Sequence, residues 1–321
     1  MTNAQAGPAG ILARLLDYLP ATIDRRVRVV AWASLACQLL LVGTGGLVRL
    51  TGSGLGCPTW PQCSAGSFVT TPEMGLHGVI EFGNRLLTFV LVIVVIAAFL
   101  AVFRMRRVRR DLFWLTFIQG MSIPFQAVLG GISVLAKLNP YVVGSHFIVS
   151  MVLVRITATL VYRVYNGPRG DSPATPRWHA AVTRVAAVFV AITVVLGILT
   201  TGAGPHAGDA NTHRNGFDPK TIEVLHAVPA FAVFALTLVL VAGAFRLGLQ
   251  HRFVLMLLGV EVAQIIVGLV QANTGLPAFL VGAHLVLAGL LVAAMTAVTH
   301  TLENDADLAK PVPEAAVSAT A

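Results

Sequence analysis

Long apolar runs separated by short polar stretches dominate the chain. A membrane-spanning helix needs about 20 consecutive apolar residues, and eight runs reach that length. The first of them, VVAWASLACQLLLVGTGGLV, is longer than the apolar core of a signal peptide and lacks an obvious small-residue cleavage site. We therefore interpret it as a retained helix. The predicted spans are 29–50, 75–103, 112–135, 141–165, 178–202, 221–245, 252–273 and 278–301.

Composition places the chain in the class of all-α integral membrane proteins. Hydrophobic residues make up 56% of it and charged residues only 11%, against roughly 25% charged residues in soluble domains. In a membrane protein, the Lys and Arg residues behind the net charge of +8 indicate which loops lie in the cytoplasm. No nucleic-acid partner is expected. The stretches 1–28 and 302–321 are predicted tails, and 166–177 a linker between two groups of four helices, 29–165 and 178–301.

The positive residues alternate between the two sides of the predicted membrane. Loops rich in Lys and Arg remain in the cytoplasm, which predicts that both termini are cytoplasmic and that loop 51–76, with no Lys or Arg, is outside. The cytoplasmic set comprises Arg14, Arg25, Arg26, Arg28, Arg104, Arg106, Arg107, Arg109, Arg110, Arg163, Arg169, Arg177, Arg246 and Arg252; the other side has only Lys137, Arg214 and Lys220.

The outer loop contains TGSGLGCPTWPQC, with two of the three cysteines in the chain. Disulfides form outside the cytoplasm, the Gly and Pro residues allow the loop to fold back, and no His or third Cys in the loop completes a zinc site. We predict a disulfide between Cys57 and Cys63. The bridge is either a local staple or a thiol pair that exchanges electrons or disulfides with a partner.

The two halves of the chain resemble each other. QAVLGGISVLAKLNPYVVGSHF from Gln126 matches QIIVGLVQANTGLPAFLVGAHL from Gln264 at a constant offset. IEFGNR and IEVLHA match less closely and place Asn84 opposite His226. Four helices separate the copies, so we predict two similar four-helix bundles in a parallel repeat.

Three histidines fall near the outer starts of predicted helices: His146, His226 and His284. Each lies about 8 Å inside the helix boundary, at 1.5 Å per residue. Histidine is rare inside membranes and indicates function there. Equal depth on several helices of one bundle predicts axial ligands to a flat cofactor, for which haem is the natural candidate. Apart from His77, the remaining five, His179, His206, His213, His251 and His300, are predicted surface residues.

The second predicted helix carries His77, Glu81 and Asn84 on one face, at i, i+4 and i+7. A carboxylate inside the membrane is costly without a partner or a task. Glu81 is either a structural partner of Arg85 or Arg49 or a proton-transfer group at the cofactor. Both interpretations remain open from the residues alone.

Together these features resemble the haem A synthases, the CtaA family of cytochrome oxidase assembly proteins. The resemblance covers about residues 29–300 and depends on the eight helices, the loop GLGCPTWPQC, the motif IEFGNR, and the three histidines at helix starts. It implies oxidation of the C8 methyl group of haem O to the formyl group of haem A, for the terminal oxidase of respiration.

The resemblance also implies roles for individual residues. Substrate haem would occupy the N-terminal half, at His146, and a haem b cofactor the C-terminal half, held by His226 and His284. Glu81 would match the essential glutamate of the family, and its outer-loop cysteine pair would match Cys57 and Cys63.

One position departs from the family pattern Glu-x-x-His-Arg, because Asn84 stands where the histidine is expected. His77 lies about 10 Å further out along the helix. His146 could bind the substrate haem alone and leave the iron open, His77 could bind a displaced haem, or the chain could have lost the reaction; we favour the first. Arg49 and Arg85 are candidates for pairing with the haem propionates.

Other functions fit parts of the pattern. A non-catalytic haem-binding or electron-transfer protein would have little use for Glu81, and a secondary transporter, suggested by the parallel repeat, would not need histidines at one depth. The expected partners of a synthase are haem O, delivered by haem O synthase, membrane lipid, an electron acceptor that the sequence does not specify, and a possible second copy of the chain.

Overall fold

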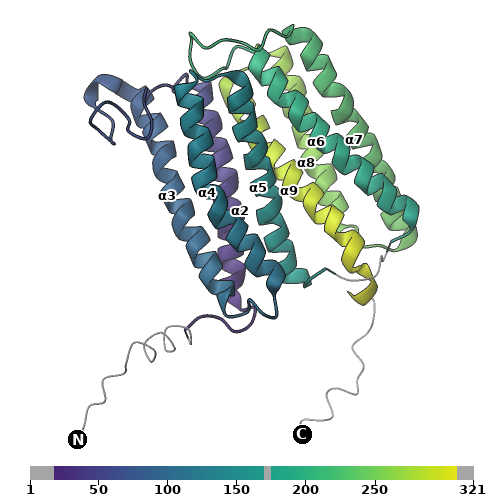
Figure 1. The fold of residues 1–321 in the computed structure, drawn as a ribbon. Coiled ribbons are helices and arrows are strands. Elements are labelled where there is room, and N and C mark those ends of the chain that lie inside the picture. The colour runs from purple at the N-terminus through teal and green to yellow at the C-terminus, as the bar shows by residue number, and fades with distance from the viewer. Residues whose placement is uncertain (1–17, 170–174, 309–321) are drawn as a thin grey trace, which may run out of the picture.

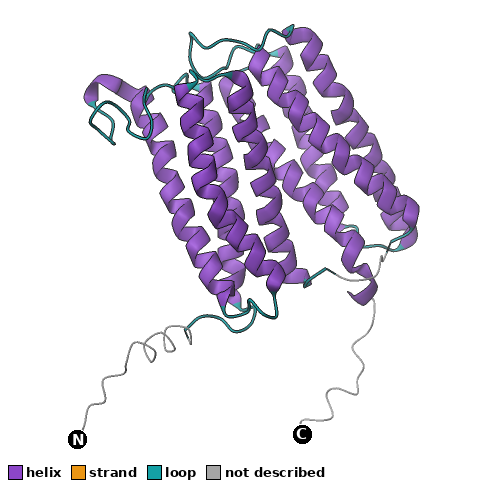
Figure 2. Ribbon diagram, viewed as in Figure 1, coloured by secondary structure: helices purple, strands orange, loops and turns teal. Residues whose placement is uncertain are grey.

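The computed structural model describes residues 18–169 and 175–308, and within these ranges the secondary structure is helical, without strands (Figure 2). Eight helices are long and apolar enough to cross a membrane, which confirms the predicted class and number of spans. The helices are α2 Arg25–Leu50, α3 Gly75–Phe103, α4 Arg110–Leu135, α5 Pro140–Asn166, α6 Arg177–Ala203, α7 Pro219–Leu247, α8 Arg252–Asn273 and α9 Ala278–Leu308, with a short 3-10 helix, η1 Pro72–Met74.

Several helices extend beyond the apolar runs that predict them. α2 begins at Arg25 rather than at residue 29, and α9 continues to Leu308 rather than ending at 301. Charged and polar residues continue these helices because backbone hydrogen bonding does not depend on apolar side chains. Residues 1–17, 170–174 and 309–321, which include most of the predicted tails, lie outside the described residues.

Two helices begin at a cap followed by proline. The side chain of Asn139 accepts a hydrogen bond from the amide of Tyr141 at 3.0 Å, and Asp218 accepts one from the amide of Thr221 at 2.8 Å. Proline at the first helical position has no N–H to satisfy and a helical φ. Hydrogen bonds from the hydroxyl and amide of Thr221 hold the pKa of Asp218, outside the membrane span, below its usual value.

The helices pack as two neighbouring groups (Figure 1). α2 contacts α3 and α5, and α4 contacts α3 and α5; α6 contacts α7 and α9, and α8 contacts α7 and α9. Buried side chains form one hydrophobic cluster centred on α2 and α5 and a second centred on α7, α8 and α9.

Helix α9 joins the two groups. It packs against α2 and α5 as well as against α6 and α8. A Cβ on Gly46 of α2 would lie 2.9 Å from Cδ1 of Leu285, and one on Gly289 of α9 would lie 2.7 Å from Cδ2 of Leu39. Small residues let helix backbones approach closely inside a membrane, so these glycines set the short distance between α2 and α9.

Candidate functional site

The loop between α2 and α3 contains the predicted disulfide. Cys57 and Cys63 are bonded, with their Cα atoms 4.4 Å apart, and both side chains are fully buried. The predicted pairing is confirmed, and Cys37 on α2 is a free thiol. The bridge closes a small ring whose carbonyl groups point to α3.

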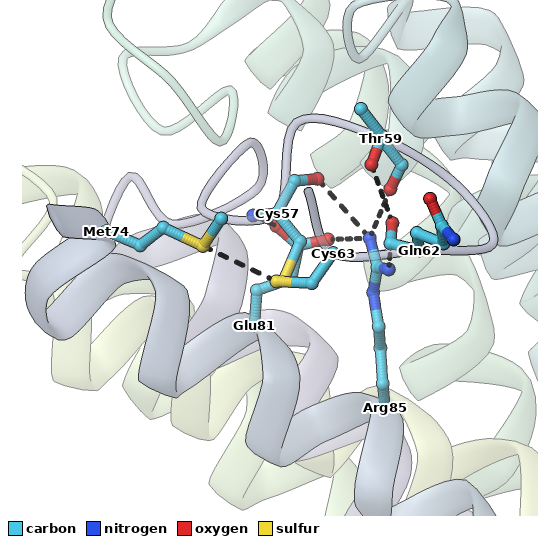
Figure 3. A network of polar contacts seen from close by, with 7 residues as sticks. All are labelled: Cys57, Thr59, Gln62, Cys63, Met74, Glu81 and Arg85. Atoms are coloured by element: carbon cyan, nitrogen blue, oxygen red, sulfur yellow. Dashed lines mark hydrogen bonds and ion pairs between the residues drawn. A yellow bond between two sulfur atoms is a disulfide. The ribbon is translucent and has the colours of Figure 1, made fainter. Parts of the chain in front are cut away.

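Glu81 and Arg85 on α3 fasten this ring to the helix (Figure 3). The Oε2 atom of Glu81 accepts the backbone N–H of Cys57 at 2.7 Å, and its Oε1 atom accepts Nη2 of Arg85 at 2.6 Å. Arg85 also donates to the carbonyl oxygens of Cys57, Thr59 and Gln62, at 3.3, 3.3 and 3.4 Å. The carboxylate is buried and the guanidinium half-buried, so the pair is shielded from water.

This geometry shows that Glu81 has a structural partner, Arg85, and that Arg49 is not that partner. Arg49 instead donates to the carbonyl oxygens of His206 and Thr201, at 2.6 and 3.1 Å, and so connects α2 to the loop after α6. Glu81 is the only acid in the network of Cys57, Thr59, Gln62 and Arg85. The same carboxylate that holds the loop is therefore also the group in this network that can transfer a proton.

The other two residues on the predicted face of α3 contact α2 or the residues just after it. His77 is exposed, and its Nδ1 atom lies 2.9 Å from Oγ of Ser53. Asn84 is half-buried and accepts the hydroxyl of Thr44 at 2.7 Å. The amide of Asn84 therefore has one oxygen lone pair committed to α2.

His146 on α5 and Trp60 of the disulfide loop lie against neighbouring glycines on α4, Gly130 and Gly131 respectively. A Cβ on Gly130 would lie 3.5 Å from Cε1 of His146, and a Cβ on Gly131 would overlap the indole ring of Trp60. The Nδ1 atom of His146 is buried without a hydrogen-bond partner. The glycines thus admit an imidazole from α5 and the tryptophan of the disulfide loop on the same stretch of α4.

His226 on α7 and His284 on α9 face each other. Their ring centroids lie 6.3 Å apart, with the planes at 71°. Glycines again make the room: a Cβ on Gly197 would lie 3.0 Å from Cε1 of His226, and one on Gly268 would lie 3.2 Å from Cε1 of His284.

An iron bound by both rings would need ligand nitrogens about 4 Å apart, at metal–nitrogen bonds of about 2 Å. The centroid separation of 6.3 Å is compatible with that, because ring centroids lie further from a bound metal than the nitrogens do. The Nδ1 atom of His226 lies 3.0 Å from the carbonyl oxygen of Thr193; a proton on Nδ1 donated there leaves Nε2 with its lone pair free for a metal. The Nδ1 atom of His284 is buried without a partner.

The structure corrects one prediction for the remaining histidines. His179 is buried, lies within α6, and has Nε2 3.4 Å from the carbonyl oxygen of Leu240; the prediction of a surface residue is wrong, because the ring packs against α7 beside Gly243. His213 and His251 are exposed as predicted, whereas His206 and His300 are half-buried.

Sequence reasoning missed a second buried carboxyl group. Glu261 on α8 is only 4% exposed and accepts the hydroxyl of Thr237 on α7 at 2.8 Å. The signal was available, since a single acidic residue stands within the apolar run VLMLLGVEVAQIIVGLV. Comparison of the two halves did not reveal this acid, because the matching position in the first half is Ile123.

These features define a class: a multi-pass α-helical membrane protein in which α7 and α9 bring two histidines to face each other inside the helix bundle. Residues 28–296 match the family COX15-CtaA, described as cytochrome oxidase assembly protein. The chain belongs to this family, and the resemblance seen in the sequence is confirmed.

Curated relatives agree with this assignment. The haem A synthase of Bacillus pumilus (strain SAFR-032) is 32% identical over 169 residues, which are 51% of this chain and 53% of the relative. That of Listeria welshimeri is 28% identical over 144 residues, 44% of this chain and 47% of the relative. The haem A synthase of Geobacillus thermodenitrificans is 28% identical over 124 residues, 39% of this chain and 38% of the relative. The matches span about half the length of these relatives or less.

Replacing both Cys57 and Cys63 with serine should loosen the loop without unfolding the protein. Opening a ring of this size costs about 2 kcal/mol of stability in the chain-entropy description, and Arg85 still holds the loop carbonyls. Alkylation should label no thiol at these positions in the unmodified protein until a reductant is added. Free thiols at Cys57 and Cys63 in protein trapped under air would contradict the bridge.

Proposed function

We propose that this protein is a haem A synthase, which oxidises the C8 methyl group of haem O to a formyl group and so supplies haem A for assembly of the terminal oxidase. The observation that carries the proposal is the facing pair His226 and His284, 6.3 Å apart, in a chain of the cytochrome oxidase assembly family. The relatives named haem A synthase support the substrate.

The C-terminal half, 178–301, would hold haem b through His226 and His284. Haem b bound there would supply an iron that accepts and passes on single electrons. The chain's own contribution is to present two imidazoles from α7 and α9 and to fix the tautomer of His226 through Thr193. Gly197 and Gly268 keep the backbone of α6 and α8 from crowding the rings.

The N-terminal half, 29–165, would bind haem O at His146. Asn84, opposite His226 in the repeat, has its oxygen bonded to Thr44 and is a poor iron ligand beside an imidazole. The substrate iron would then have one protein ligand and one open face. Trp60, against Gly131, closes the α4 side of this region next to His146.

Glu81 would exchange the protons that the methyl oxidation releases. It is buried beside the disulfide loop and has a hydrogen-bond donor at each oxygen, so its protonation is coupled to the loop and to Arg85. Arg85 already donates through Nη2 to Glu81 and to the loop carbonyls of Cys57 and Thr59, so a haem propionate would have to be bound by its other N–H groups or displace these contacts. Arg49 is similarly engaged with Thr201 and His206.

The positive-inside rule supports an orientation with both termini in the cytoplasm and the Cys57–Cys63 loop outside. The arginine-rich connections lie at the end of the helix bundle where α2 begins and α9 ends, and the disulfide loop lies at the opposite end (Figure 1). The proposal includes two partners that the sequence analysis expects. Haem O synthase would deliver the substrate, and an electron acceptor would take the electrons released by its oxidation.

The test is to extract the pigments from the purified protein and identify them by mass spectrometry, before and after incubation with haem O in lipid. We expect haem O or haem A beside haem b. His146→Ala is the matched variant: it should retain haem b and lose the second haem. Haem b alone in the unmodified protein after incubation would favour a non-catalytic haem-binding protein instead.

Asn84→His should close the open face of the substrate iron. In the unmodified protein the N-terminal haem is expected to be high-spin and to bind cyanide or carbon monoxide, whereas the variant should be low-spin and should exclude the probe. Optical spectroscopy with each probe measures the difference. A low-spin N-terminal haem in the unmodified protein that is lost in His77→Ala would instead identify His77 as the second ligand.

A further inference from the structure

Glu261 is a carboxyl group near the middle of α8, Arg252–Asn273, within a membrane span. Its side chain is buried, its Oε1 atom accepts the hydroxyl of the fully buried Thr237 at 2.8 Å, and its Oε2 atom has no hydrogen-bond partner. A buried carboxyl group with a free oxygen can take up a proton there without breaking an existing hydrogen bond.

Folding alone does not explain this acid. An ionisable group inside a membrane costs free energy and indicates a functional site by default. The matching position of the first half is occupied by Ile123, so a helix of this kind packs without a carboxyl group. Glu223, the other acid described on α7, α8 and the part of α9 up to residue 302, is half-buried and pairs with the exposed Lys220 at 3.4 Å near the start of α7.

The same face of α8 leads from Glu261 to the paired histidines. Gln264, one turn along, donates to the carbonyl oxygen of His284 at 3.2 Å, and Gly268, two turns along, lies against the ring of His284. Seven residues of helix place Glu261 about 10 Å from the level of Gly268. Among the described residues, the titratable side chains that face this interior from neighbouring helices are His179 on α6, His226 on α7 and His284 on α9.

Buried polar groups also lie between Glu261 and the end of the bundle where α6 begins, away from His226 and His284. Thr237 lies one turn from Leu240, whose carbonyl oxygen is 3.4 Å from Nε2 of His179. His179 is the third residue of α6, is buried, and has an unpartnered Nδ1 atom. His179, near the start of α6, and Glu261, near the middle of α8, thus contact the same stretch of α7, at Leu240 and Thr237.

We propose that Glu261 takes up a proton when the haem held by His226 and His284 is reduced and releases it when that haem is oxidised, with His179 as the group through which the proton arrives. The inference rests on the proposed haem site. A haem held there would take up one electron from the oxidation of haem O while Glu261 forms one O–H bond with a proton from bulk water; when that haem passes the electron to the acceptor, Glu261 would release the proton. In surroundings of low dielectric constant, the added negative charge increases the proton affinity of a carboxylate nearby.

Redox titration of the haem-loaded protein at several pH values tests this. The midpoint potential of the unmodified protein should fall as pH rises, by up to about 59 mV per tenfold change in proton concentration, the limit for one proton per electron. Glu261→Gln should make the potential independent of pH over the same range and leave the optical spectrum of the haem unchanged. Glu223→Gln is the matched control and should retain the slope.

If Glu261→Gln binds haem poorly, the Thr237→Val variant and infrared difference spectroscopy test the role of Glu261 without removing its carboxyl group. Thr237→Val removes only the hydroxyl that contacts the carboxyl group, and it should shift the pH range of the slope. The infrared difference spectrum between reduced and oxidised protein should show a carboxyl C=O band in the unmodified protein that shifts in this variant, and His179→Ala should slow its appearance after rapid reduction.

The outcomes separate the two proposals. A low-spin haem whose pH slope and carboxyl band are the same in Glu261→Gln as in the unmodified protein would refute the role of Glu261 and leave the haem site intact. Unmodified protein without any low-spin haem in its C-terminal half would refute both.

Discussion

Protein carrying His284→Ala should be isolated without the low-spin haem of its C-terminal half. The imidazole is one of two rings that face each other across 6.3 Å, and Ala supplies no replacement ligand. Since even partners behind a ligand contribute roughly 10- to 100-fold to metal affinity, removing a ligand itself should reduce haem retention at least to that extent. The optical spectrum of the purified protein measures the loss.

Two controls distinguish ligand loss from misfolding. His251→Ala changes an exposed histidine and should retain the full haem spectrum. Free imidazole added to His284→Ala during haem loading should restore the low-spin spectrum, because the space left by the side chain admits it. Unchanged spectra in both His226→Ala and His284→Ala would refute the assignment of the ligands.

Glu81→Gln should abolish haem A formation and retain haem b. Glutamine preserves the acceptor for the amide of Cys57 but removes the titrating group and the charge opposite Arg85. General acid–base catalysis typically contributes 10²- to 10⁴-fold, so the yield of haem A per protein should fall by roughly 100-fold or more. Pigment analysis after incubation with haem O measures haem A and haem b in the same sample.

Arg85→Gln separates catalysis by Glu81 from its structural contact. This variant removes the donor to the loop carbonyls of Cys57, Thr59 and Gln62 but leaves the carboxyl group in place. If the structural contact alone matters, both variants should lose haem b or fail to assemble, and their activities should fall together. Retained assembly with loss of haem A only in Glu81→Gln would establish proton transfer.

The sequence predicts the membrane spans and the paired histidines well because both follow from local patterns. Apolar runs of sufficient length specify the helices, and the positions of His226 and His284 near the outer starts of their helices predict a common depth, where the structure finds them facing each other. The disulfide between Cys57 and Cys63 follows from spacing and compartment and is also confirmed.

Contacts between distant segments could not be predicted in the same way. The attachment of the disulfide loop to Arg85, the position of Trp60 against Gly131, and the burial of His179 depend on how helices and loops meet in space. Glu261 is different: its sequence neighbours identify it as unusual, but only its contact with Thr237 shows that the acid points into the bundle.

The contacts of α9 have a consequence for how the protein is made. Of the eight described membrane-spanning helices, α2 leaves the ribosome before the others and α9 after them, yet these two helices pack against each other, with Gly46 and Gly289 at their junction. The first four helices can enter the bilayer early but complete their packing only after the final helix has been synthesised. Chains interrupted before Ala278 therefore leave exposed the faces of α2 and α5 that α9 covers in the finished protein.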